Sequence, residues 1–250
     1  MEKMWKYIIL ASAVVLSAMV LAAAYTNPSR NAGTISVVGL GETEFVSDLI
    51  VIRGAIVVNN EDAAAGYTEL EAKCKKITDF LVSKGVEADG VTFAMPSISE
   101  DYEDIYDDGN YVGRKKIGYN FYQSFTIESK EVDRVEVAAR ELPSLMTQGV
   151  MVSVYEPMYY YTELESVKHN LIAAAAEDAR LRAELIATNS NARLGQLATS
   201  RAGVFQITAA TGDEEFSAGG SFNLSSREKK ARVTVRAEYK IKQKSKQQPK

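Results

Sequence analysis

Two arms rich in β-forming residues meet at a four-residue turn, and this pattern constrains the fold more than any other feature of the sequence. The turn is DDGN at residues 107–110, between VTFAMPSISEDYEDIY and YVGRKKIGYNFYQSFTIES. An Asp-Gly pair between such arms is a strong hairpin signal, because both turn residues must tolerate positive φ. The second arm alternates apolar with polar residues and places Tyr119, Phe121, Phe125 and Ile127 on one face. The sequence therefore predicts an antiparallel sheet with one solvated face.

Two helical patterns flank this hairpin. Residues 61–85 carry apolar side chains at steps of three and four, with Lys and Glu between them. Asn60 is placed to cap the start of this helix, and Gly85 is placed to supply a left-handed exit. A second helix follows Ser129, and we expect Pro143 to kink or divide it.

A third helix is the longest. It opens at a Thr-x-x-Glu capping box of Thr162 and Glu165 and runs to about Ala187. Its apolar side consists of Leu164, Val167, Leu171, Ala175, Ala179 and Leu185. The alanines predict close contact with a sheet or another helix. With the strands between the helices, the predicted order is ββαββαβαββ. Hairpin-joined strands with helices packed on one side indicate an α+β fold with antiparallel sheets, not a doubly wound parallel sheet.

The N-terminal region predicts the compartment. Residues 7–24 carry no charge and follow a short region with two lysines. A basic start, an apolar run and small residues at its end are typical of a signal peptide, and the run is also long enough for a membrane anchor. We expect residues 1–24 to be one or the other. The remaining chain is then extracytoplasmic, in the periplasm or cell envelope, either secreted or held in the inner membrane by the N-terminal helix.

Charge and composition exclude several classes of function. Removing residues 1–24 takes two Lys and one Glu from 29 basic and 33 acidic residues, which leaves a net charge of −5. An acidic chain argues against a nucleic-acid partner, because phosphate binding needs a basic face. Cys74 is the only cysteine and His169 the only histidine. No internal disulfide can form, and no zinc, copper or haem constellation of the usual kinds can be assembled, so we expect no cofactor and no metal centre.

The segment TISVVGLGETEF at residues 34–45 partly matches a dinucleotide-binding fingerprint. Gly39 and Gly41 fit the first and third glycines of that motif, but its sixth position is Glu44. A strand follows where the motif needs a helix. We therefore exclude a dinucleotide site and expect the two glycines to serve a bend or a bulge between consecutive strands.

The order of the segments resembles the SIMPL domain family, also called DUF541. The features that carry the resemblance are the strand ending in GLGE, the arm and helix YNFYQSFTIESKEVDRVEVAARELPSLMTQGV, the alanine-rich helix AAAAEDARLRAELIATNSNARLGQLATSRAG and the closing strand ARVTVRAEYKIK. They cover residues 33–242, which we expect to form the SIMPL-like domain, and a disordered basic tail follows at 243–250. The resemblance implies a bacterial periplasmic, membrane-associated or secreted protein. Some relatives are linked to oxidative-stress defence, some are immunogenic envelope proteins and some form large oligomers. It implies no catalytic residues.

Two constellations are candidate binding surfaces. Tyrosines gather on neighbouring strands, and we identify Tyr119, Tyr122, Tyr159 and Tyr161 as a candidate interface, since tyrosine is favoured at subunit contacts. Acidic residues gather near the turn, and Asp101, Asp104, Asp107 and Asp108 form a candidate weak cation site. The calcium-loop register of an EF-hand fails there, and a solvated acidic hairpin is the alternative interpretation.

These observations predict a non-enzymatic envelope protein that acts by self-assembly or partner binding. We expect a homo-oligomer or contact with another envelope protein, with membrane contact through residues 7–24 where they are retained, and a link to stress defence by family analogy. The alternative is a periplasmic binding module for a small ligand, a wall fragment or a cation. A hydrolase with scattered carboxylates is the third hypothesis.

Overall fold

The computed structural model describes residues 12–22, 33–211 and 217–243, and the described chain forms an α+β fold. It divides into two compact units. Unit 1 consists of Met1–Gly41, Leu171–Gly203 and Val233–Lys250, and unit 2 consists of Glu42–Asn170 and Val204–Arg232. Three elements contribute residues to both units: β1 (Thr34–Val46), α4 (Leu164–Asn189) and β11 (Glu228–Gln243).

Unit 2 is built on an antiparallel sheet ordered β3-β5-β2-β6, with β4 also paired to β5 and β7 to β2. Its strands are β2 (Leu49–Asn60), β3 (Val91–Phe93), β4 (Ser97–Asp107), β5 (Asn110–Ser129), β6 (Val152–Val154) and β7 (Met158–Tyr160). Its helices are α2 (Ala63–Ser83) and α3 (Val132–Glu141), with 3₁₀ turns η2 (Ala88–Gly90) and η3 (Leu142–Gln148). The unit also holds β9 (Gln206–Ala209) and β10 (Ser221–Phe222), which pair in parallel.

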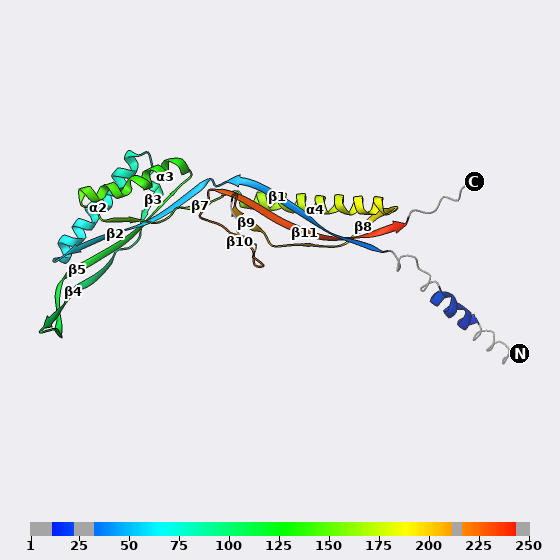
Figure 1. The fold of residues 1–250 in the computed structure, drawn as a ribbon, viewed down its shortest axis with the longest axis horizontal. Helices are drawn as coiled ribbons and strands as arrows, with labels where there is room; N and C mark the ends of the chain where they lie inside the picture. The colour runs from blue at the N-terminus through cyan, green and yellow to red at the C-terminus, as the bar shows by residue number, and fades with distance from the viewer. Residues whose placement is uncertain (1–11, 23–32, 212–216, 244–250) are drawn as a thin grey trace. The chain divides into compact units, whose positions relative to one another are not determined.

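One apolar core lies between this sheet and its two helices. Its central residues are Ile52 and Ile56 of β2 and Phe121 and Phe125 of β5, all at most 1% exposed. Leu70, Ile77 and Leu81 of α2 and Val132, Val135 and Ala138 of α3 pack into the same cluster. Both helices therefore cover one face of the sheet, as Figure 1 shows, and the predicted packing of helices on one side is confirmed for this unit.

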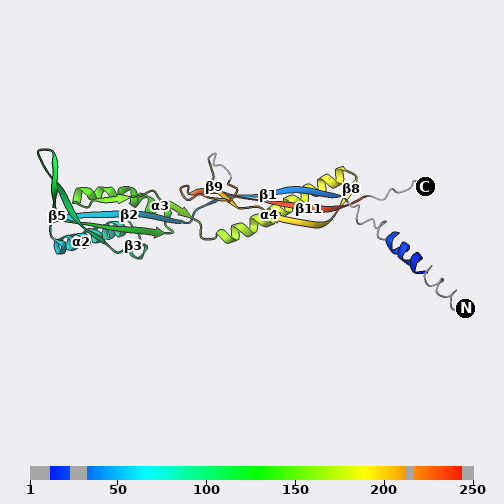
Figure 2. The same ribbon diagram turned by 90° about the horizontal axis from the view of Figure 1, so that it is seen from below.

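Unit 1 places the longest helix, α4 (Leu164–Asn189), against β1 (Thr34–Val46) and β11 (Glu228–Gln243). Figure 2 shows α4 running alongside these strands. The edge strand β8 (Ala192–Ala202) pairs antiparallel with β11. The helix buries one residue in every four along one side, namely Leu171, Ala175, Ala179, Ala183 and Ala187. Alanine at each step lets the helix backbone come close to the strands.

Gly39 and Gly41 complete this close contact. A Cβ atom on Gly39 would lie 2.1 Å from the carbonyl oxygen of Ala175 and 2.4 Å from the amide nitrogen of Ala179. One on Gly41 would lie 2.3 Å from the carbonyl oxygen of Leu171. Both glycines lie inside the unbroken strand β1. The prediction of a bend or bulge at these glycines is therefore wrong: they are required because a helix backbone occupies the space that a side chain would fill.

Two predicted helix caps are also wrong. At α2 the carboxylate of Asp62 accepts from the amide of Ala65, while the side chain of Asn60 accepts from the amide of Asp62 and donates to the carboxylate of Glu69. At α4 the amide and hydroxyl of Thr162 both donate to the carboxylate of Asp48, at 2.8 and 2.6 Å. A long-range carboxylate thus replaces the local capping box, and α4 begins at Leu164.

Other boundaries follow the predicted signals more closely. Gly85 has φ of 82° and ends α2 as expected, and Pro143 divides the second helical segment into α3 and η3. Pro96 divides the first predicted arm into β3 and β4, and Pro157 separates β6 from β7, because proline cannot donate to a ladder. Leu185 was predicted on the apolar side of α4 but is 64% exposed, and Ala183 and Ala187 are buried instead.

The N-terminal region is described only in part. Residues 12–22 are helical, and the rest of the predicted signal peptide or anchor lies outside the described residues, as does nearly all of the predicted tail at 243–250. No helix among the described residues is long and apolar enough to cross a membrane. All described core residues lie at Val37 or later in the chain.

We expect Gly39→Ala to lower the free energy of unfolding by about 1–3 kcal/mol, the usual range for overpacking. The reason is that the added methyl group would overlap backbone atoms of α4, which cannot rotate away as a side chain can. Gly219→Ala is the matched control, since the nearest atom to its added Cβ lies at 3.9 Å. Urea denaturation followed by circular dichroism measures both. Equal stability of the two variants would contradict the close contact between α4 and β1.

Candidate functional site

The outer part of the β4–β5 hairpin extends beyond the rest of its sheet. β4 pairs with β5 from Ser97 opposite Tyr122 to Asp107 opposite Asn110. β2 pairs with β5 only from Tyr119 onward. Among the described residues, no third strand therefore pairs with either edge of the hairpin between its turn and the start of the β2 ladder. Asp108 and Gly109 have φ of 46° and 80°, which confirms the predicted Asp-Gly turn.

One face of this hairpin is aromatic. The ladder between β4 and β5 has two register shifts, and at each of them the extra residue lies on β5. The side chains of β4 therefore alternate regularly, and Ile98, Tyr102 and Tyr106 share one face. Tyr111 lies opposite Tyr106, with ring centroids 5.9 Å apart and ring planes at 71°. Tyr119 lies opposite Glu100 on this face. We name these five apolar residues, Ile98, Tyr102, Tyr106, Tyr111 and Tyr119, the tyrosine face.

The tyrosine face continues the core face of the unit 2 sheet. Ile98 lies opposite the fully buried Phe121, and Tyr119 packs at the edge of the core. Past this point the apolar side chains are exposed, from 39% for Tyr102 to 61% for Tyr106. The apolar face of the sheet therefore runs on beyond the part that the helices bury. Exposed apolar residues gathered on one face are typical of interaction sites.

Charges on the same face are arranged by strand. The ammonium group of Lys116 lies 2.7 Å from a carboxylate oxygen of Glu100 and 3.9 Å from the ring centroid of Tyr119. The hydrogen bond from Lys116 holds the pKa of Glu100 below its usual value. Arg114 lies over the ring of Tyr102 at 4.5 Å. The face thus combines carboxylates on β4 with cations on β5.

The predicted cation site is spread along the hairpin. On β4, Asp101 and Asp107 project from one face and Asp104 from the other, because their positions differ in parity. Asp101 and Asp107 are six residues apart, which corresponds to roughly 20 Å in a strand. Asp108 follows in the turn. No group of three His, Cys, Asp or Glu side chains in the described parts of the chain is placed to hold a metal ion. A weak cation site here stays a prediction.

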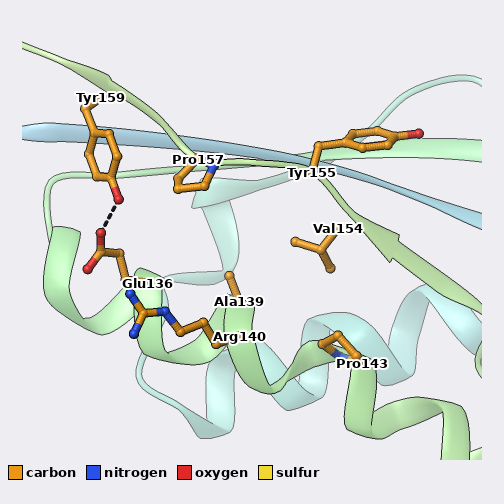
Figure 3. A pocket seen from close by; sticks show the side chains of 8 residues that line it. All are labelled: Glu136, Ala139, Arg140, Pro143, Val154, Tyr155, Pro157 and Tyr159. Atoms are coloured by element: carbon orange, nitrogen blue, oxygen red, sulfur yellow. Dashed lines mark hydrogen bonds between the residues drawn. The ribbon is translucent and has the colours of Figure 1, made fainter. Parts of the chain in front are cut away.

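A pocket of about 260 Å³ lies between α3 and the β6–β7 edge. Figure 3 shows the side chains that line it, which are Glu136, Ala139, Arg140, Pro143, Val154, Tyr155, Pro157 and Tyr159. At one end the hydroxyl of Tyr159 donates to a carboxylate oxygen of Glu136. Burial, and secondly this hydrogen bond, raise the pKa of Tyr159 to about 12. The pocket combines apolar walls with one guanidinium and one carboxylate.

The structure separates the four predicted interface tyrosines. Tyr119 belongs to the tyrosine face, whereas Tyr122 lies on the opposite face of β5, where a hydrogen bond with Tyr155 raises its pKa. Tyr159 is 6% exposed and belongs to the core, and Tyr161 is half-buried against Phe45 with ring centroids 4.8 Å apart. The predicted interface did not include Tyr102, Tyr106 and Tyr111, which lie with Tyr119 on the tyrosine face. The two-residue alternation of β4 is the signal that places Tyr102 and Tyr106 together.

The structure places Cys74 and His169 in different surroundings. The thiol of Cys74 is half-buried and donates to Oε1 of Gln123 at 3.2 Å. Burial, and secondly the charge of Glu71, raise the pKa of this thiol to about 11. His169 is an exposed residue of α4. A reactive cysteine needs a lowered pKa, so these surroundings do not activate the thiol of Cys74.

The raised pKa of Cys74 predicts slow reaction with Ellman's reagent at neutral pH. A rise from 9 to about 11 leaves ~100-fold less thiolate than in an unperturbed thiol, and thiolate is the reacting species. The native protein should therefore react ~100-fold more slowly than the urea-unfolded protein in the same buffer, after correction for reagent reactivity in urea. Equal rates would show that the thiol is neither buried nor raised in pKa.

Tyr159 should ionise late in an alkaline titration. Its neutral form is favoured in the folded state, so this contribution to stability is complete below pH 10 and is lost as the pH rises from about 10 toward 12. The difference in absorbance at 295 nm between the wild type and Tyr159→Phe isolates this one hydroxyl. We expect its midpoint near pH 12, and a midpoint at pH 10 would contradict the buried contact with Glu136.

Comparison with protein-family models gives a match over most of the chain. A family model described as SIMPL, protein of unknown function (DUF541), matches residues 35–239, most of the chain. A comparison with curated proteins finds no match. The matched range includes β1 with its two glycines, the tyrosine face, the pocket and α4. The chain therefore belongs to the SIMPL family, as the order of its segments predicts.

Proposed function

We propose that this SIMPL protein acts without catalysis in the cell envelope, by assembling with further copies of itself through the tyrosine face. The observation that carries the proposal is an apolar sheet face that continues from the core into solvent. Tyrosine suits such a contact, because its ring buries a large apolar area while its hydroxyl stays hydrated. The expected envelope location rests on the apolar run at residues 7–24.

The charges of the tyrosine face favour a second copy as the partner. Glu100 and Asp104 lie on β4, and Arg114 and Lys116 lie on β5. A two-fold axis parallel to the strands lays β4 of one copy over β5 of the other, so that carboxylates meet cations on both sides. A face that complements itself in this way is what a symmetric dimer requires.

Light scattering on size-separated protein tests this assembly. We expect residues 26–250, purified without the apolar segment, to form a single assembly at tens of micromolar. The double variant Tyr106→Ser, Tyr111→Ser should be monomeric, because it removes two rings that are 61% and 58% exposed and contribute little to the core. Tyr67→Ser, Tyr155→Ser is the matched control, with rings 42% and 51% exposed outside the tyrosine face. A monomeric wild type, or equal loss in both variants, would contradict the proposal.

The pocket beside α3 favours a second candidate function, the binding of a small anionic ligand with an apolar body. Arg140 lines the pocket and has no ion-pair partner among the described residues, while prolines and Val154 supply apolar walls. Calorimetry with benzoate tests this function, with Arg140→Gln as the variant that should lose the heat. A flat titration of the wild type at millimolar benzoate removes its main support.

A further inference from the structure

The uncovered face of the sheet in unit 1 is basic. On β11, Ala237 and Tyr239 point toward α4 and are buried, so the alternate residues Arg236, Lys240 and Lys242 point away from it and are exposed. On β8, Arg201 lies directly opposite Arg236, and Arg193 lies opposite Lys242. Opposed residues of an antiparallel pair project from the same face. We name Arg193, Arg201, Arg236, Lys240 and Lys242 the basic face.

These cations do not stabilise one another within the protein. Like charges placed opposite each other in a sheet are destabilising. Ion pairs between described residues include none with the five cations of the basic face. Within unit 1, Glu238 is the single acidic residue in this outward-facing row of β11, since Glu228 in the same row belongs to unit 2. A surface that collects cations without internal partners fits an anionic partner.

The position of the basic face indicates which anion it meets. The amide of Ile241 donates to the carbonyl oxygen of Gly33 at 2.9 Å, so Arg193 and Lys242 lie at the end of unit 1 where the chain arrives from its N-terminal region. Eight residues, 25–32, separate Gly33 from the apolar run at 7–24. At 3.3–3.6 Å per residue they span at most about 30 Å. If the apolar run lies in a bilayer, this end of the face is held close to the lipid headgroups.

Apolar side chains accompany the cations. Gly39 and Gly41 point toward α4, so Val38 and Leu40 of the neighbouring strand β1 point away from it, and they are 43% and 42% exposed. Cations mixed with aliphatic side chains suit a headgroup region, where phosphates lie next to acyl chains.

We propose that the basic face docks on an anionic bilayer surface and binds lipid phosphate groups. The inference rests on the proposed envelope location and adds a binding surface that the tyrosine face does not supply. Docking through this face leaves α4, on the other side of the sheet, turned away from the membrane. The acidic hairpin belongs to the other unit, and an acidic segment of a second copy is the competing partner for the same cations.

Flotation with lipid vesicles tests the basic face directly. Residues 26–250 retain every described core residue and lack the apolar run, so any binding comes from the folded chain. The vesicles are phosphatidylcholine alone or with about a quarter phosphatidylglycerol, at low ionic strength. The face variant is Arg201→Gln, Arg236→Gln, Lys240→Gln. The control with the same net charge is Lys75→Gln, Lys115→Gln, Lys130→Gln, all exposed and outside the face.

We expect the wild type and the control to float with anionic vesicles only, and the face variant to bind them at least ~10-fold more weakly, since each cation near an anionic surface adds to the affinity. Equal flotation with neutral vesicles, no flotation of the wild type, or equal loss in the control overturns the proposal. So does a face variant that still floats but no longer assembles, because the cations then serve a second copy. The Tyr106→Ser, Tyr111→Ser variant is floated in the same way. If it binds anionic vesicles as the wild type does, membrane binding through the basic face does not depend on self-assembly through the tyrosine face.

Discussion

The close contact of α4 with β1 determines which surfaces unit 1 can offer. Gly39 and Gly41 leave room for the backbone of α4, and alanines at four-residue steps bring the helix down onto the strands. Because α4 covers one face of the sheet, the alternate residues of β1, β11 and β8 must meet solvent or a partner. Those residues include the five cations of the basic face. The close packing of α4 on β1 therefore determines both which residues of this sheet are buried and which are exposed.

In unit 2, too, helices cover one face of a sheet, but part of that face stays exposed. Its helices bury the core face of the sheet around β2 and β5, but the β4–β5 hairpin extends that face past the β2 ladder. Apolar residues in the same alternation become exposed there, and cations of β5 stack on tyrosine rings. An apolar surface with matched charges is stable in water as a monomer and can still be buried against a partner.

Local signals in the sequence predicted much of this fold. The Asp-Gly turn, the alternation of β5, the exit at Gly85 and the break at Pro143 depend on neighbouring residues, and the structure confirms them. The α+β class and the SIMPL family followed from the order of such signals. The signals failed where the deciding partner is distant. Thr162 donates to Asp48, and α4 fills the space beside Gly39. In each case the two partners are more than a hundred residues apart in sequence.

The surfaces were harder to predict than the elements. The four candidate interface tyrosines separate into core, edge and opposite faces, because the face on which a side chain lies depends on strand register and burial. The basic face was missed because Arg201 and Arg236 meet only through the pairing of β8 with β11. The net charge of −4 for the whole chain also conceals a local excess of cations. The alternation in RVTVRAEYKIK is the signal that could have placed Arg236, Lys240 and Lys242 on one face.

If copies of the chain meet at the β4–β5 hairpin, the backbone amides of this hairpin are protected in the assembly. Amide hydrogen exchange of residues 97–117, measured by mass spectrometry over a range of protein concentrations, detects this protection. These amides should exchange more slowly as the concentration rises, while the amides of α2 keep constant rates. Exchange of residues 97–117 that does not change with concentration, at concentrations where the protein is assembled, would contradict a contact at this hairpin and place the contact elsewhere.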